Sequence, residues 1–264
     1  MTDGRPRGFG IAAGLDPAVG RELAQRCESL GYASLWSNDH PAASGLETVA
    51  VFAKAAERPD VGVAVMALDR HAPGDVAAKL SDVGIAPARL WLGIGAGFTK
   101  RPLGVVREGL AALRDVLPKD ARIVVAAMGP KMCALAGAEA DGAFLNWMTP
   151  EKAAWARERV HEGAAEAGRP DPPPVFGYVR VAVGDGAAER LRKEEWFYRQ
   201  LHQGYIRHFE ALGAPEGTVR IAADDPAGVA QQLDEYEAID HVVVRALAHA
   251  DAESLGNVAA AATP

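Results

Sequence analysis

The sequence predicts an α/β fold, a single (β/α)8 TIM barrel that spans residues 1–264. Short apolar runs are each followed by a helical pattern of about a dozen residues, and this alternation indicates parallel strands joined by crossover helices. Eight such units fit into 264 residues with few residues left for insertions, which is the usual size of this barrel. We therefore expect one barrel domain.

The first half of the chain contains four strand–helix units. Asp16 and Pro17 mark the first helix start, because an acidic N-cap and a proline at the first helical position both favour initiation. Gly31 ends this helix. The predicted strands are 8–13, 34–36, 61–68 and 90–94, and the helices that follow them are 17–30, 46–56, 73–83 and 103–117.

The second half continues the same alternation. Thr149 and Pro150 form another capped helix start, and Asp225 with Pro226 forms a third. The predicted strands are 123–127, 142–146, 175–183 and 240–245. Five helices are predicted in this half. A short one begins at 130, one spans 150–167, and one long helix spans about 187–212. The last two pass through 229–236 and span 251–262.

Composition and charge limit the classes of binding partner that we expect. The net charge is −7 at pH 7 and no basic stripe with interleaved aromatic residues is present, so we expect no nucleic-acid partner. No apolar stretch approaches the roughly 20 residues that span a membrane, and the N-terminus has no apolar signal core. These features predict no membrane partner and a cytoplasmic location. Cys27 and Cys133 lie apart within apolar helical patterns and are interpreted as core residues.

The best catalytic candidates are Asp39 and His40, which follow the second strand. The loops after the carboxyl ends of barrel strands form the active-site mouth. A histidine has its pKa near neutrality, and a neighbouring carboxylate can fix its tautomer. The equally weighted alternative is that Asp39 caps the following loop and His40 only lines the mouth.

Glycines and helix starts supply candidate ligand contacts in three later loops. Gly95, Ala96 and Gly97 follow the fourth strand, where glycine lets the backbone approach a ligand, although a tight structural turn explains them as well. Gly129 and Pro130, after Met128, begin a helix whose free amides can bind an anion, but such helix starts are common.

Two further positions keep alternative interpretations. Asn146 and Trp147 precede the cap Thr149, and Trp147 is either part of this helix start or an aromatic wall for a planar ring. Arg245 ends the last predicted strand, where it either binds phosphate or forms a salt bridge.

The sequence lacks the residues that several kinds of catalysis need at the strand ends. No cluster of metal ligands sits on the strand ends, and Asp39 and His40 with Asp69 and His71 lack the further partners that a metal site needs. We expect no metal. The predicted strands carry no lysine for Schiff-base chemistry and no carboxylate pair for glycoside hydrolysis. A weakly charged, glycine-rich mouth suits a planar phosphorylated cofactor that brings its own chemistry.

Five segments together carry a resemblance over nearly the whole chain. They are Glu28–His40, Val61–His71, Leu92–Gly97, Ala126–Met132 and Ala136–Asn146. In order and spacing, they resemble the luciferase-like flavin-dependent oxidoreductases, in particular the branch that uses the deazaflavin coenzyme F-420. FMN is the alternative cofactor.

The resemblance implies that the deazaflavin lies across the barrel mouth. Its ring would rest on a bulge after the third strand that contains a cis peptide between Ala64 and Val65, and His40 beside Asp39 would accept the substrate proton. Gly129, Pro130, Asn146 and Trp147 would hold the phosphate end. The cofactor-binding set implied in this way is Ala64, Val65, Gly95, Ala96, Gly97, Met128, Gly129, Pro130, Asn146 and Trp147.

The predicted function is hydride transfer between coenzyme F-420 and a small organic substrate. Sugar-phosphate dehydrogenases of this branch carry a Glu where this chain has Phe98, so the substrate is expected to differ. The alternatives are an FMN-dependent monooxygenase of the same superfamily, a catalytically silent flavin- or deazaflavin-binding protein, and an unrelated barrel isomerase or lyase that acts on a phosphorylated metabolite.

Five aromatic residues in the region after the seventh strand are expected to form a lid or a homodimer contact. They are Trp196, Phe197, Tyr198, Tyr205 and Phe209. For Tyr205 and Phe209 a role in core packing is favoured. Homodimers are common among proteins of the family that the chain resembles.

Overall fold

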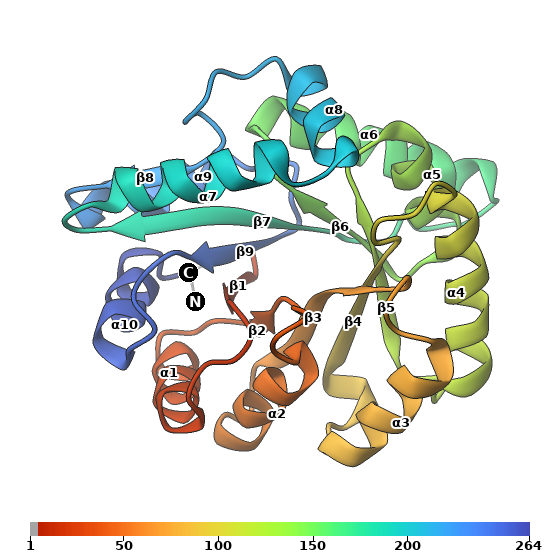
Figure 1. Cartoon of the computed structure of the whole chain (residues 1–264), viewed down its shortest axis with the longest axis horizontal. Coiled ribbons are helices and arrows are strands. Elements are labelled where there is room, and N and C mark those ends of the chain that lie inside the picture. The colour runs from red at the N-terminus through yellow and green to blue at the C-terminus, as the bar shows by residue number, and fades with distance from the viewer. Residues whose placement is uncertain (1–4) are drawn as a thin grey trace.

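The computed structural model describes residues 5–264 and shows a closed parallel barrel surrounded by helices (Figure 1). Every strand pairing is parallel, and β1 pairs with β9 while β9 pairs with β7, which closes the ring. The predicted TIM barrel is therefore confirmed. The strands are β1 (Arg7–Ile11), β2 (Ser34–Ser37), β3 (Asp60–Ala67), β4 (Leu90–Gly95), β5 (Arg122–Ala127), β6 (Gly142–Asn146), β7 (Val175–Val183), β8 (Ile221–Ala223) and β9 (His241–Ala246).

The helices alternate with these strands and pack outside them. Asp16, Ser44, Thr149 and Asp251 each cap a helix by accepting a backbone N–H of its first turn. The helices are α1 (Pro17–Ser29), α2 (Gly45–Ala55), α3 (Pro73–Val83), α4 (Pro102–Val116), α5 (Pro130–Glu139), α6 (Pro150–Glu166), α7 (Ala187–Leu201), α8 (Gln203–Leu212), α9 (Val229–Asp234) and α10 (Ala252–Ala261).

An aromatic cluster fills the barrel interior. Trp36 is fully buried, and its ring lies 5.0 Å from the Phe144 ring and 5.5 Å from the Phe176 ring. A Cβ added at Gly62 would collide with the Trp36 ring, so this glycine makes room for the indole. A larger aliphatic core joins the outer faces of the strands to the helices and includes Cys27 and Cys133. Both cysteines are buried core residues as predicted, and burial raises the pKa of the Cys133 thiol to about 12.

Two predicted elements differ in the structure. The single helix expected over 187–212 is two helices, because His202 has an extended backbone and its ring Nδ1 accepts the Gly204 N–H as the cap of α8. Sequence patterning also missed β8, which has three residues and alternates in burial. The first four residues of β7 pair with β6 and its last three with β8, so β8 extends the sheet beyond the end of β6.

None of the described helices has both the length and the apolar character needed to cross a membrane.

Candidate functional site

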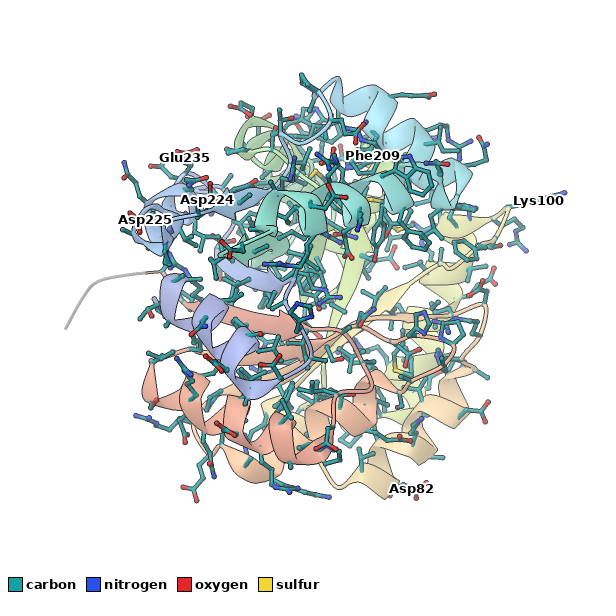
Figure 2. The ribbon with its side chains drawn as sticks, turned by 60° about the vertical axis from the view of Figure 1, so that its left-hand side comes forward. Asp82, Lys100, Phe209, Asp224, Asp225 and Glu235 are labelled. Atoms are coloured by element: carbon teal, nitrogen blue, oxygen red, sulfur yellow. The ribbon has the colours of Figure 1, made fainter. Side chains whose placement is uncertain are left out.

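A cavity of about 180 Å³ opens among the carboxyl-terminal strand ends, and we call it the mouth cavity. Its walls come from β3, β5, β6, β7 and β9 and from the helices α7 and α8. Figure 2 shows Phe209 on α8, and it shows Lys100 projecting outward from the loop after β4. The lining residues are Asn38, Asp39, Ala64, Val65, Ala126, Ala127, Met128, Phe144, Asn146, Tyr178, Arg180, Tyr198, Tyr205 and Arg245.

One wall is a bulge in β3. The register between β3 and β4 shifts between Val63 and Met66, and the peptide bond between Ala64 and Val65 is cis, as the resemblance implies. A Cβ at Gly95 would lie 2.8 Å from Val65 Cγ2, and one at Gly93 would collide with the Val63 carbonyl oxygen. These glycines of β4 therefore make room for the bulge, and Ala64 and Val65 face the cavity.

The loop after β4 is a tight turn. Gly97 has φ of +68°, and a Cβ there would collide with the Asp69 carboxylate. Asp69 Oδ2 in turn accepts the Phe98 N–H at 2.8 Å. Gly95, Ala96 and Gly97 do not line the mouth cavity within the described part of the chain. Phe98 is 64% exposed, and its ring centroid lies 4.7 Å from that of His202.

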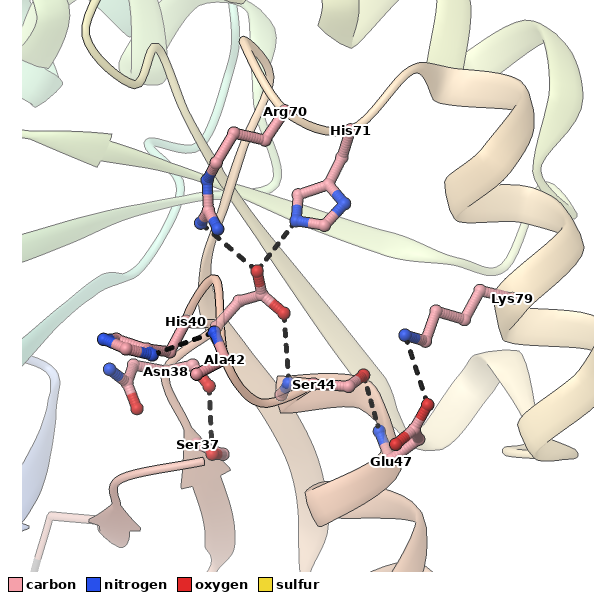
Figure 3. Close-up of polar contacts among 11 residues, drawn as sticks. Ser37, Asn38, His40, Ala42, Ser44, Glu47, Arg70, His71 and Lys79 are labelled. Carbon is pink, nitrogen blue, oxygen red and sulfur yellow. Dashed lines mark hydrogen bonds and ion pairs between the residues drawn. The ribbon is translucent and has the colours of Figure 1, made fainter. Parts of the chain in front are cut away.

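Asp39 is the centre of a polar network at the cavity wall, and Figure 3 shows Arg70 and His71 pointing toward one carboxylate of this network. Its Oδ2 accepts a hydrogen bond from His71 Nε2 at 2.7 Å and one from an Arg70 Nη at 3.3 Å, and its Oδ1 accepts the Gly45 N–H at 3.1 Å. Only 4% of the Asp39 side chain is exposed. This carboxylate therefore both caps the loop before α2 and orients His71.

His40 is exposed and does not contact Asp39 through a hydrogen bond in residues 5–264. Its Nδ1 accepts the Ala42 N–H at 3.1 Å, so protonation of that nitrogen requires this bond to break. In His71 the bond to Asp39 places a proton on Nε2 and leaves Nδ1 unprotonated in the neutral ring. From the sequence, His71 was weighed only as a metal ligand. Its position two residues after Asp69, in the loop that follows β3, nevertheless indicates that it lies at the barrel mouth.

The helix starts after β5 and β6 differ in their caps. Gly129 precedes α5 without a side-chain cap, is exposed, and has no atom within 4 Å of an added Cβ. Thr149 caps α6 by accepting the Lys152 N–H at 3.2 Å. The structure thus leaves the first amides of α5 without a capping side chain at the cavity rim.

Trp147 turns away from the cavity. This residue has φ of 54°, is 1% exposed, and packs against Phe209 while the Arg180 guanidinium lies 3.6 Å from its ring centroid. Its neighbour Asn146 lines the cavity instead, accepts a hydrogen bond from Arg180 at 2.6 Å and donates one to the Tyr205 hydroxyl at 3.1 Å. Within residues 5–264, no three His, Cys, Asp or Glu side chains come together as a candidate metal site.

The sequence matches the model of the luciferase-like monooxygenase family over residues 3–117 and 100–255. The chain belongs to this family. Luciferase-like family members are oxidoreductases and monooxygenases.

Solved structures share the fold of this luciferase-like chain at low identity. An F-420-dependent secondary alcohol dehydrogenase in complex with an F-420–acetone adduct has a TM-score of 0.76 and 18% identity, with 96% of each chain covered. The F-420-dependent tetrahydromethanopterin reductase of Methanopyrus kandleri has a TM-score of 0.74 and 18% identity over 97% of each chain. The oxygenating constituent of 3,6-diketocamphane monooxygenase from Pseudomonas putida, in complex with FMN, has a TM-score of 0.67 and 16% identity over 99% of each chain.

We expect Asp39→Ala to lower the free energy of unfolding by about 1–3 kcal/mol, because the Gly45 amide and two cationic side chains lose a buried acceptor. His40→Ala is the matched control, and it should change this free energy by less than about 0.5 kcal/mol because the ring is exposed. Urea unfolding of the three proteins measures both values. Equal destabilisation by the two substitutions would show that Asp39 is not the centre of the network.

Proposed function

We propose that this luciferase-like chain transfers hydride between coenzyme F-420 and a small organic substrate. The observation that carries the proposal is the β3 bulge, which presents Ala64 and Val65 as an apolar wall of the mouth cavity. Two F-420-dependent enzymes with the same fold support it. An FMN-dependent monooxygenase is the second candidate, supported by the fold likeness to the FMN-containing diketocamphane enzyme.

The described residues fit a planar phosphorylated cofactor. Ala64, Val65, Ala126 and Met128 give an apolar surface for a ring, and the start of α5, which has no side-chain cap, leaves the Lys131 N–H for a phosphate. Hydride donation and acceptance are the chemistry that a deazaflavin supplies when it is bound. The protein's part is to orient the ring and the substrate and to exclude water from the reacting face.

The proton that accompanies hydride transfer needs an acceptor near Asp39. The sequence favours His40, whereas the hydrogen bonds favour His71, because Asp39 accepts the His71 Nε2–H and leaves Nδ1 of that ring as an acceptor. Protonation of His40 at Nδ1 would instead remove its bond to the Ala42 amide. We therefore propose that His71, positioned by Asp39, accepts the proton.

Cofactor titration tests the proposal. Cofactor-free protein is titrated with F-420 and separately with FMN, and the fluorescence of each cofactor is followed. We expect F-420 to bind at least tenfold more tightly than FMN, which corresponds to about 1.4 kcal/mol. Tighter binding of FMN would replace the hydride-transfer proposal with the monooxygenase, and binding of neither cofactor would refute both.

Gly129→Asp should weaken binding of F-420 by about tenfold or more. The new carboxylate can cap α5 and occupy the amides that a phosphate would need, while repelling that phosphate. Gly74→Asp is the matched control, because Gly74 lies in the first turn of α3, which also lacks a side-chain cap, and its Cβ position is also open. Equal affinity of the two variants for F-420 would place the phosphate elsewhere.

His71→Ala should lower kcat about 100-fold with the alcohols or ketones that the wild-type protein converts, because general acid–base catalysis typically contributes 10²–10⁴-fold. The dissociation constant for F-420 should change little. His40→Ala is expected to lower kcat less than tenfold. Steady-state kinetics of the two variants decide between the histidines, and the opposite order would assign the proton to His40.

A further inference from the structure

Two buried arginines stand side by side in the mouth cavity. Arg180 on β7 and Arg245 on β9 are register partners in the sheet, and they are 2% and 7% exposed. Both side chains line the cavity. A buried guanidinium is costly unless a negative charge or several acceptors compensate it, so the partners of each arginine show what the site lacks.

Arg180 is largely compensated by the protein. One of its Nη atoms donates to Asn146 Oδ1 at 2.6 Å, its guanidinium carbon lies 3.6 Å from the Trp147 ring centroid, and its Nε lies 3.6 Å from Glu194 Oε1. The Nε nevertheless has no hydrogen-bond partner. Arg180 therefore keeps an unused donor in a buried position.

Arg245 has much less compensation. Its one hydrogen bond within residues 5–264 goes from an Nη to the carbonyl oxygen of Ala246 at 3.2 Å, and no carboxylate in that range lies within 4.0 Å of it. Asp39, the carboxylate on the cavity wall, is already engaged by Arg70, His71 and the Gly45 amide. The positive charge of Arg245 thus has no carboxylate partner among residues 5–264.

Tyr178 adds a neutral donor to the same cavity as the two arginines. It lies on β7 two residues before Arg180, lines the same cavity and is register partner of Val243, two residues before Arg245. Its hydroxyl is buried and has no hydrogen-bond partner. Burial raises the pKa of Tyr178, so the hydroxyl stays protonated and able to donate near neutral pH.

We propose that Arg245, Arg180 and Tyr178 bind the carboxylate of the substrate. This inference rests on the proposed function and names its substrate class as small organic acids. A planar carboxylate matches the donor fork of a guanidinium, and both arginines line the cavity.

The position of the arginines separates them from the proposed cofactor wall. In the closed ring of eight strands, β7 lies opposite β3, which carries Ala64 and Val65. The uncapped start of α5, proposed for the cofactor phosphate, follows β5. The proposed carboxylate and the proposed cofactor ring are thus assigned to opposite walls of the mouth cavity. The same anion chemistry could also recognise the cofactor's own phosphate, and the experiment distinguishes the two sources.

The test uses cofactor-free protein and simple probes. Acetate, propionate and butyrate, their uncharged amides and inorganic phosphate are titrated by calorimetry and by tryptophan fluorescence, since Trp147 contacts Arg180. We expect saturable binding of a carboxylate and at least tenfold weaker binding of its amide. Arg245→Met should weaken carboxylate binding at least tenfold, because a charged hydrogen bond is lost.

Arg101→Met is the matched control, because it removes the same charge from an exposed side chain and should leave carboxylate binding unchanged. Tyr178→Phe removes only the hydroxyl and should weaken binding severalfold, so it tests the site even where Arg245→Met fails to fold. Absence of saturable carboxylate binding, or equal binding by the Arg245→Met and Arg101→Met variants, would overturn the proposal.

Repeating the titration with saturating F-420 or FMN identifies the source of the anion. Unchanged carboxylate affinity supports a substrate site. Mutual exclusion of the carboxylate or phosphate and the cofactor would overturn the assignment and give the arginines to the cofactor. The carboxylate measurement needs no cofactor, so its failure is distinct from failure of the F-420 titration that tests the proposed function.

Discussion

The fit of the β3 bulge against the glycines of β4 determines the shape of the site. A regular parallel ladder would keep the β3 backbone in register along its whole length, but Val63 and Met66 are separated by a shift relative to β4. Neither Gly93 nor Gly95 has room for a side chain where the bulge contacts β4. Because barrel interiors are close-packed, a methyl group at either position would displace Ala64 and Val65 and with them one wall of the mouth cavity.

A second constraint is the handling of buried charge at the barrel mouth. Asp39 is surrounded by donors on three sides, and Arg180 is held by Asn146 and stacked on Trp147. Contacts of this kind fix the orientation of the side chains that make them, although the Arg180 Nε keeps no hydrogen-bond partner. Arg245 differs, because the described protein supplies it with a single carbonyl oxygen. The contrast within one cavity is what assigns a ligand to this side chain rather than a structural role.

Much of the barrel was predictable because its signals are local, whereas the site depends on long-range pairing. Proline and cap residues marked the starts of α1 and α6, and continuous apolar runs marked β3 and β7. A three-residue strand has too few positions to show periodicity, so β8 was missed. The pairing of Asp39 with His71 joins loops 32 positions apart, and no local pattern distinguishes it from the adjacent His40.

The two walls of the mouth cavity come from different parts of the chain, and this division affects how substrate specificity can vary. The apolar wall comes from β3 and β5, strands that the sequence pattern already located. The polar wall comes from β7 and β9 and from Tyr198 and Tyr205 on α7 and α8, in the half where β8 and the break at His202 depart from regular alternation. Loop and helix insertions of a barrel can vary while the strand scaffold is kept. The proposed hydride chemistry therefore depends on the regular half, and the choice of substrate on the irregular one.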